Sequence, residues 1–224
     1  MKQTEQARRG RWDAVVFDLD GTLADTLRDL AEATNAALNA NGLPAHPVET
    51  YRQMVGNGLR KLVERAAGPE ATEQDRKRVL ADFERIYDRD CLRFTTVYDG
   101  MEPTVQALRE QSIPLLVVTN KPDRQAQTIV THLFGEETFA AVYGNREGRA
   151  VKPDPRLTLE ALRATGAEPG RSLFVGDSDV DILTARNAGM HSAGAAWGFR
   201  GEDELLRAGA EWILHKPAEI LNSY

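Results

Sequence analysis

Two carboxylates stand directly after a short apolar run near the start of this sequence. Residues 14–17 read Ala-Val-Val-Phe, and the segment Asp-Leu-Asp-Gly-Thr follows them. In an extended chain, residues i and i+2 project to the same side, so Asp18 and Asp20 form a pair. An Asp-Gly hairpin turn is the alternative interpretation. It is weakened because we expect no second strand next: the chain continues into a helical pattern.

Other polar side chains also stand where an apolar run ends or a helix begins. Thr119 and Asn120 close one such run, and Lys152 precedes a proline and a helical pattern. Asp177 and Asp181 follow another run. Each segment also has a simpler explanation when it is considered alone. Thr119 and Asn120 could form a turn, Lys152 could be a solvated surface charge, and Asp177 and Asp181 could belong to a helix N-terminus with acidic residues in its first turn.

The segments point to one chemistry if the apolar runs are strands of one parallel sheet. Ligands of such sheets bind outside the carboxyl ends of the strands, where the four aspartates then crowd one crevice. Carboxylates at close range repel unless some are protonated or a cation neutralises them, and all-oxygen ligation suits Mg²⁺. A Mg²⁺ flanked by Lys152 and Thr119 predicts a phosphate-binding site.

The elements that must position these side chains alternate along the chain. Short apolar runs bounded by turn residues predict strands, and polar segments of helical period follow them. The predicted strands are residues 14–17, 113–119, 139–143, 172–176, 191–195 and 212–214. Alternation of this kind predicts an α/β fold with a doubly wound, Rossmann-like parallel sheet and helices on both faces.

The pattern changes between Asp25 and about Tyr98, where helical stretches follow one another and no strand is convincing. One helix is predicted around residues 27–38 and another over residues 72–92. We therefore expect an inserted α-helical cap domain over residues 25–98. The catalytic core then comprises residues 11–24 plus 99–224, and residues 1–10 form a flexible tail.

Composition narrows the function classes. The 224 residues carry 28 Lys+Arg against 34 Asp+Glu, a net charge of −6, which argues against nucleic-acid binding. No apolar run approaches the length of a membrane span, and the N-terminus lacks the apolar stretch of a signal peptide, so we expect a cytoplasmic protein without membrane contact. Cys91, the single cysteine, excludes an internal disulfide and a multi-cysteine metal site.

Four motifs in this order resemble a known superfamily. They are Asp-x-Asp-Gly-Thr at residues 18–22, Thr-Asn at 119–120, Lys-Pro at 152–153 and Gly-Asp-Ser-x-x-Asp at 176–181. These four motifs identify the chain as similar to the phosphatase branch of the haloacid dehalogenase superfamily. The likeness covers nearly the whole chain, because the helical insertion corresponds to the cap that this superfamily inserts after the first motif.

The resemblance implies a role for each matching residue. Asp18 is expected to be the nucleophile that forms an aspartyl-phosphate, and Asp20 the acid that protonates the leaving group and later activates water. Mg²⁺ is expected to be held by Asp18, the Asp20 backbone carbonyl and Asp177. An acid at position 20 also points to phosphate-ester hydrolysis or phosphosugar mutation within the superfamily.

The same resemblance assigns the remaining polar residues to the phosphoryl group. Thr119, the Asn120 backbone N–H and Lys152 are expected to hold the transferring oxygens. Asp181 is expected to orient Lys152 or a metal-bound water, and Ser178 to support that arrangement.

Substrate contacts are predicted in the cap segment of residues 54–62. Gly56, Asn57 and Gly58 form a glycine-rich turn before a helix that begins with Arg60 and Lys61, which suits contact with a substrate anion. Alternatively, the glycines separate two cap helices and the two basic side chains are solvated.

The cap segment, the Thr-Asn-Lys-Pro motif and residues 196–201 resemble phosphoglycolate phosphatases. They imply Mg²⁺-dependent hydrolysis of 2-phosphoglycolate by a monomer or homodimer. Alternatives are pyrophosphate, a sugar phosphate or an amino-sugar phosphate as substrate, and a phosphosugar mutase. A phospho-aspartate signalling module and a non-catalytic binding protein are the non-enzymatic alternatives; receiver domains lack the helical insertion.

Overall fold

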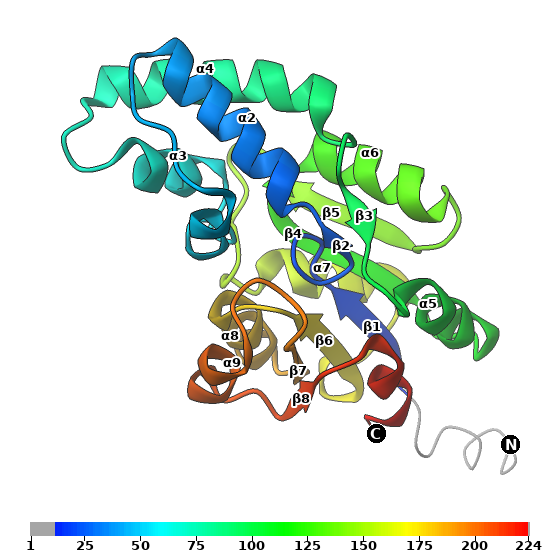
Figure 1. Ribbon diagram of the computed structural model, residues 1–224. Helices are drawn as coiled ribbons and strands as arrows, with labels where there is room; N and C mark the ends of the chain where they lie inside the picture. The colour runs from blue at the N-terminus through cyan, green and yellow to red at the C-terminus, as the bar shows by residue number, and fades with distance from the viewer. Residues whose placement is uncertain (1–11, 224) are drawn as a thin grey trace, which may run out of the picture.

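A computed structural model describes residues 12–223 of the chain (Figure 1). Its centre is a six-stranded sheet in the order β5-β4-β1-β6-β7-β8, and every neighbouring pair is parallel. The strands are β1 (Ala14–Phe17), β4 (Leu115–Pro122), β5 (Ala141–Asn145), β6 (Ser172–Gly176), β7 (His191–Ala195) and β8 (Trp212–Leu214). The predicted α/β fold with a doubly wound sheet is confirmed.

Helices cover both faces of this sheet because side chains alternate along its buried strands. On β1, Val15 and Phe17 enter one hydrophobic cluster, while Ala14 and Val16 enter another. The first cluster includes residues of α5 (Met101–Glu110) and α6 (Asp123–Phe134). The second includes residues of α7 (Arg156–Thr165) and α8 (Asp179–Ala188). The remaining core elements are η2 (Pro169–Arg171), α9 (Glu202–Ala208) and η3 (Pro217–Asn222).

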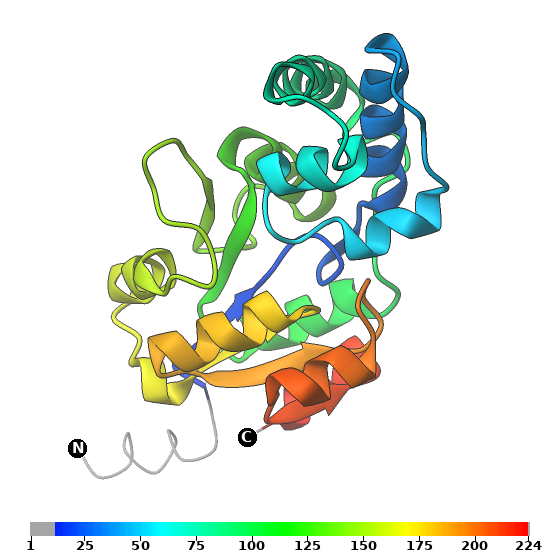
Figure 2. The ribbon, with the colours of Figure 1, turned by 90° about the vertical axis from the view of Figure 1, so that its left-hand side faces the viewer.

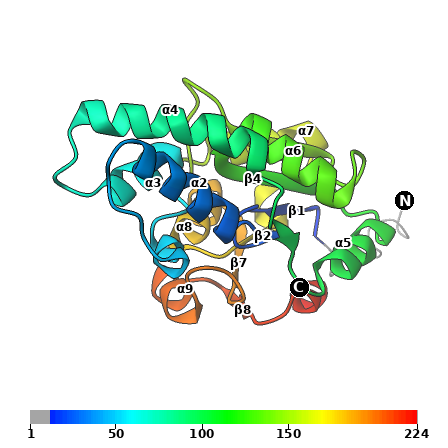
Figure 3. The same cartoon turned by 45° about the horizontal axis from the view of Figure 1, so that its top comes forward.

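The helical insertion contains α2 (Leu27–Ala40), η1 (Val48–Gln53), α3 (Leu59–Ala67) and α4 (Glu73–Asp90). Figures 1 and 3 show α2 and α4 side by side beyond the carboxyl end of β1. Figure 2 shows the same unit, in blue to green, at one end of the sheet. Thr72 starts α4 with a capping box in which Asp75 takes part. The inserted cap is thus confirmed, whereas its boundaries at residues 25 and 98 stay predictions.

One expectation was wrong: the insertion is bounded by strands. Ala24–Asp25 (β2) and Thr96–Val97 (β3) form a two-stranded antiparallel sheet where the chain leaves and re-enters the core. Two-residue strands leave no alternating pattern in a sequence, and pairing across 72 intervening positions depends on how the insertion folds. The two connections of the cap therefore lie side by side.

Within residues 12–223, no helix has the length and apolar character of a membrane span. The tail predicted at residues 1–10 lies outside the described part of the chain.

Candidate active site

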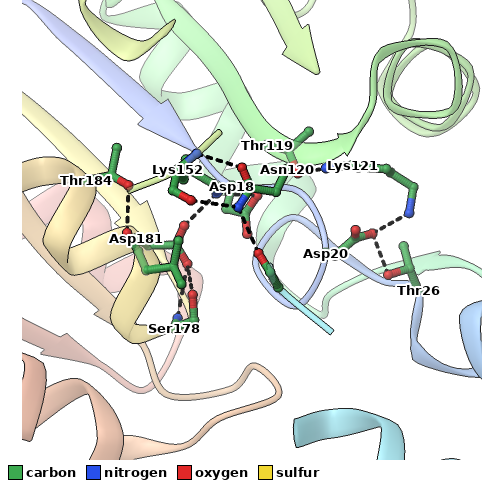
Figure 4. Close-up of polar contacts among 12 residues, drawn as sticks. Asp18, Asp20, Thr26, Thr119, Asn120, Lys121, Lys152, Ser178, Asp181 and Thr184 are labelled. Carbon is green, nitrogen blue, oxygen red and sulfur yellow. Dashed lines mark hydrogen bonds and ion pairs between the residues drawn. The ribbon is translucent and has the colours of Figure 1, made fainter. Parts of the chain in front are cut away.

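Asp18 follows the last residue of β1, at the carboxyl edge of the sheet. Its backbone N–H donates to Val175 on β6, at 2.9 Å, so the neighbouring strand fixes its position. The residue is 5% exposed. Its Oδ1 lies 2.8 Å from Lys152 Nζ as an ion pair, without hydrogen-bond geometry (Figure 4). Burial raises the pKa of Asp18 to about 6, although Lys152 acts in the opposite direction.

Lys152 is buried between two carboxylates. Its ammonium donates to Asp181 Oδ1 at 2.6 Å in addition to the pair with Asp18. Burial disfavours the charged amine, yet the two carboxylates hold its pKa above the usual value. Asp181 is held in turn by Ser178, whose hydroxyl and backbone N–H both donate to Oδ2 in the capping box of α8. Asp181 and Ser178 therefore fix the ammonium beside Asp18.

The side chain of Asp177 has room only because Gly21 and Gly198, which lie against it, have no Cβ. A Cβ at Gly21 would overlap its Oδ2, and a Cβ at Gly198 would overlap its Cβ. Asp177 Oδ2 accepts a hydrogen bond from the Phe199 N–H at 2.7 Å. Burial, Asp181 and Asp18 raise the pKa of Asp177 well above its ordinary value. This carboxyl group is thus held in place by the loop that follows β7.

Three carboxylates meet at this point. One oxygen each of Asp18, Asp177 and Asp181 lies within 4.8 Å of the others, the one such group of potential metal ligands within the described residues. A single ammonium, that of Lys152, offsets their charge, and Asp18 Oδ1 has no hydrogen-bond donor. A buried, all-oxygen set with excess negative charge fits a hard divalent cation. The cluster is thus able to hold such an ion.

The Asp20 side chain lies outside this group, although the sequence placed four aspartates in one crevice. Its Oδ1 accepts hydrogen bonds from Thr26 Oγ1 at 2.6 Å and Lys121 Nζ at 2.8 Å (Figure 4). Sequence reasoning assigned no role to Lys121. The signal was present, since Lys121 stands two residues after Thr119 on an extended segment, and both line the same cavity.

Asn120 connects the core to the cap through its side chain. Its Nδ2 donates to Gly56 O at 3.0 Å, and its Oδ1 accepts from the Lys152 N–H at 2.8 Å. The sequence prediction concerned only the backbone N–H of Asn120. Thr119, directly before it, is buried and lines the cavity beside Asp18.

A small cavity of about 20 Å³ lies between core and cap, and a volume of this size holds about one water molecule. Its lining comes from the segment after β1, from β4 and from the cap, and consists of Asp18, Asp20, Leu30, Val55, Gly56, Gly58, Leu59, Leu62, Thr119, Asn120 and Lys121. The site thus has a polar end on the core and a mostly apolar wall on the cap.

Of the predicted cap contacts, Gly56 and Gly58 line this cavity and the others do not. Asn57 accepts a hydrogen bond from Arg65. Lys61 is exposed and pairs with Glu64 at 2.8 Å, while Arg60 is exposed at a different cavity, between α3 and α4. The contact of Asn57, Arg60 and Lys61 with substrate stays a prediction.

The loop of residues 197–200 contacts the cap, Asp177 and the segment between β1 and β2. Trp197 Nε1 donates to Thr22 O at 3.0 Å. Arg200 donates to Gln53 Oε1 at 2.5 Å and to Val55 O at 2.9 Å, although it belongs to the core. Arg200 therefore anchors the cap segment that continues into Gly56.

A parallel sheet with carboxylates and a lysine at its carboxyl edge, covered by a helical insertion, defines a class of hydrolases. The family model described as haloacid dehalogenase-like hydrolase matches residues 15–195. The chain belongs to this family.

Two curated relatives that cover nearly the whole chain are named as phosphatases. The chain is 32% identical over 212 residues to a phosphoglycolate phosphatase of Haemophilus influenzae, covering 92% of this chain and 95% of that protein. It is 34% identical over 217 residues to an N-acetylmuramic acid 6-phosphate phosphatase of Pseudomonas aeruginosa, covering 96% of both. A crystal structure of a predicted phosphoglycolate phosphatase from Haemophilus somnus is similar with a TM-score of 0.88 and 31% identity, over 96% of this chain and 98% of that one. The prediction of a haloacid dehalogenase-type phosphatase is confirmed.

Proposed function

We propose that this protein hydrolyses a small phosphate monoester through an aspartyl-phosphate on Asp18, with Mg²⁺ as cofactor and 2-phosphoglycolate as substrate. One observation carries the chemistry. The Lys152 ammonium lies between the buried carboxylates of Asp18 and Asp181, and Asp177 completes an oxygen cluster within 4.8 Å. A buried nucleophile with a cation beside it suits attack on an anionic phosphate.

The metal ion is proposed from the donor set. Asp18, Asp177 and the Asp20 backbone carbonyl would hold it, and Mg²⁺ supplies positive charge that neutralises the phosphoryl oxygens beside the anionic nucleophile. Oxygen donors alone, without His or Cys among the clustered residues, favour Mg²⁺ over zinc.

The first half of the reaction forms the covalent intermediate. A carboxylate oxygen of Asp18 bonds to phosphorus as the bond from phosphorus to the ester oxygen breaks. The protonated Asp20 gives its proton to that ester oxygen, so the leaving group departs as an alcohol. Lys121 and Thr26 hold the Asp20 side chain in place, outside the cluster of three carboxylates.

The second half returns the free enzyme. Asp20, now a carboxylate, accepts a proton from water, and the water oxygen bonds to phosphorus while the bond to Asp18 breaks. Throughout, the Thr119 hydroxyl and the Lys152 ammonium bind phosphoryl oxygens and stabilise the charge of the transition state. Asp181 keeps the ammonium in place through its 2.6 Å hydrogen bond.

The substrate assignment rests on similarity. A phosphoglycolate phosphatase is 32% identical over nearly the full chain. The relative named for N-acetylmuramic acid 6-phosphate, at 34% identity over 96% of both chains, makes an amino-sugar phosphate the second candidate.

Phosphate release from a panel of esters tests the proposal. The panel contains 2-phosphoglycolate, N-acetylmuramic acid 6-phosphate, a hexose phosphate and pyrophosphate, each with Mg²⁺ and with a chelator. We expect Mg²⁺-dependent release with the highest kcat/KM for 2-phosphoglycolate. Preference for the amino-sugar phosphate would keep the mechanism and change the substrate. A phospho-aspartate that persists without turnover would overturn the hydrolase assignment in favour of a signalling module.

A further inference from the structure

Lys121 is a buried cation at the junction of core and cap. Its side chain is 1% exposed, and it lines the cavity together with Asp18, Asp20 and Thr119. The ammonium lies 2.8 Å from Asp20 Oδ1 and 4.7 Å from the ring centre of Tyr87, a residue of the cap helix α4. Among the residues that line the cavity, it is the one with a cationic side chain.

The ammonium has bonding capacity left over. It carries three N–H donors, and within residues 12–223 its one hydrogen bond is to Asp20. The face of the Tyr87 ring is its other close contact. Lys152 differs in this respect because two carboxylates already hold it. Lys121 is therefore the cation of the cavity that can accept a further anion.

Lys121 also lies beside the residue that meets the leaving group in the proposed reaction. Its ammonium is 2.8 Å from Asp20 Oδ1, so a second anion close to the ester oxygen would lie within reach of its remaining N–H donors.

We infer that Lys121 binds a carboxylate on the leaving group of the substrate while Asp20 contacts the ester oxygen beside it, an inference that rests on the proposed function. The 2.8 Å between Lys121 Nζ and Asp20 Oδ1 sets the geometry. Phosphate esters of α-hydroxy acids match it, because a single carbon atom separates their ester oxygen from the carboxylate group. The carboxylate of a muramic acid 6-phosphate belongs to the ether substituent on C3, far from the ester oxygen on C6, and does not match it. Lys121 thus selects α-hydroxy-acid phosphates.

The test compares two esters that differ only at this group. In 2-hydroxyethyl phosphate, an uncharged CH₂OH replaces the carboxylate of 2-phosphoglycolate. We expect the wild-type kcat/KM to favour 2-phosphoglycolate by at least about 30-fold, and Lys121→Met to remove most of that preference, because one partner of a buried ion pair is lost. Lys121→Arg is expected to restore part of it. Lys77→Met makes the same change at an exposed lysine of α4 and is expected to keep the wild-type ratio.

Each outcome decides one point. An equal loss for both esters in Lys121→Met means that Lys121 only positions Asp20, and it overturns the inference. A wild-type enzyme that hydrolyses both esters equally well overturns it as well, whether or not the variant folds. Absence of Mg²⁺-dependent release from 2-phosphoglycolate, with release from another ester, contradicts the proposed substrate instead.

Discussion

The carboxylate of Asp181 accepts a 2.6 Å hydrogen bond from the ammonium of Lys152, and both side chains are buried. Asp181 belongs to the first turn of α8, whereas Lys152 belongs to the segment between β5 and α7. The capping box with Ser178 fixes the carboxylate, so the start of one helix determines where the ammonium lies. The charge beside Asp18 is thereby set before any substrate binds.

Lys152→Met is expected to lower kcat by about 10²- to 10³-fold, because the variant lacks a charged donor to the transferring phosphoryl group. Asp181→Asn keeps the side-chain shape but removes the charge that holds the ammonium, and a smaller loss is expected. Steady-state kinetics with 2-phosphoglycolate measure both. Lys216→Met, at an exposed lysine, is the matched control. Full activity of Lys152→Met would show that Lys152 takes no part in phosphoryl transfer.

Asp18→Asn is expected to lower kcat by about 10³-fold or more, because an uncharged amide oxygen is a poor nucleophile toward phosphorus. Acid quenching of the wild-type reaction with labelled substrate is expected to trap a phosphoprotein that the variant does not form. Asp13→Asn, close to the start of β1 but paired with Arg171 on the surface, serves as control. A labelled Asp18→Asn protein would assign the nucleophile to another residue.

Much of this arrangement was predictable from the sequence because its signals are local. The strands of residues 14–17, 172–176, 191–195 and 212–214 coincide with β1, β6, β7 and β8; the first is followed directly by Asp18, and the second ends at Gly176. β4 runs from Leu115 to Pro122 and β5 from Ala141 to Asn145, so both ends of each strand differ from the expected 113–119 and 139–143. In β4 the extra residues continue the extended segment that carries Thr119 and Lys121.

The long-range contacts of the site were not predictable from local patterns. Lys121 pairs with Asp20, 101 positions away within the core, and Arg200 of the core contacts Val55 of the cap, 145 positions away. The first pairing depends on how β1 and β4 lie in the sheet, and the second on how the cap lies over it. Arg60 and Lys61 have the composition of an anion site, but the turn of α3 leaves both exposed. The sequence thus predicted which charged side chains are present, but not the direction in which each side chain points.

Metal-free protein is expected to become less stable as the pH rises through about 6. The pKa of Asp18 is about 6 in the fold against an ordinary value of 3.8, and the pKa of Asp177 is raised as well. Between these values the folded chain retains protons that the unfolded chain has released. The contribution of these carboxyl groups to the free energy of unfolding is therefore fully present below about pH 4 and is lost as the pH rises through about 6. Mg²⁺ binds the deprotonated cluster and is expected to offset this loss.

Thermal unfolding in chelator and in Mg²⁺, at about pH 5 and about pH 7.5, checks this expectation. The rise in Tm caused by Mg²⁺ should be larger at the higher pH. A rise of equal size at both pH values would show that the carboxyl cluster does not bind the ion. Glu64→Gln, at an exposed carboxylate, should leave the difference between the two pH values unchanged.

Gly198→Ala is expected to weaken activation by Mg²⁺. The added Cβ would overlap the Cβ of Asp177 and the carbonyl oxygen of Gly21, so the carboxylate must shift. Titration of activity with Mg²⁺ should give a higher half-saturating concentration. Gly170→Ala is the matched control, because the nearest heavy atom to its added Cβ lies 3.9 Å away. Unchanged activation in Gly198→Ala would mean that Asp177 tolerates displacement or does not bind the ion.

Arg200→Gln tests whether the core holds the cap segment in place. The guanidinium donates to Gln53 and Val55, and the segment then continues to Gly56, which lines the cavity and accepts a hydrogen bond from Asn120. Losing two charged hydrogen bonds favours an open cap, and a substrate must then close it at the expense of binding energy. We expect KM for 2-phosphoglycolate to rise about 10-fold or more with a smaller change in kcat, because Asp18 and Lys152 are untouched. Arg207→Gln, on the exposed side of α9, should leave KM as in the wild type. A fall in kcat alone would instead indicate that the loop of residues 197–200 acts through Asp177, to which Phe199 donates.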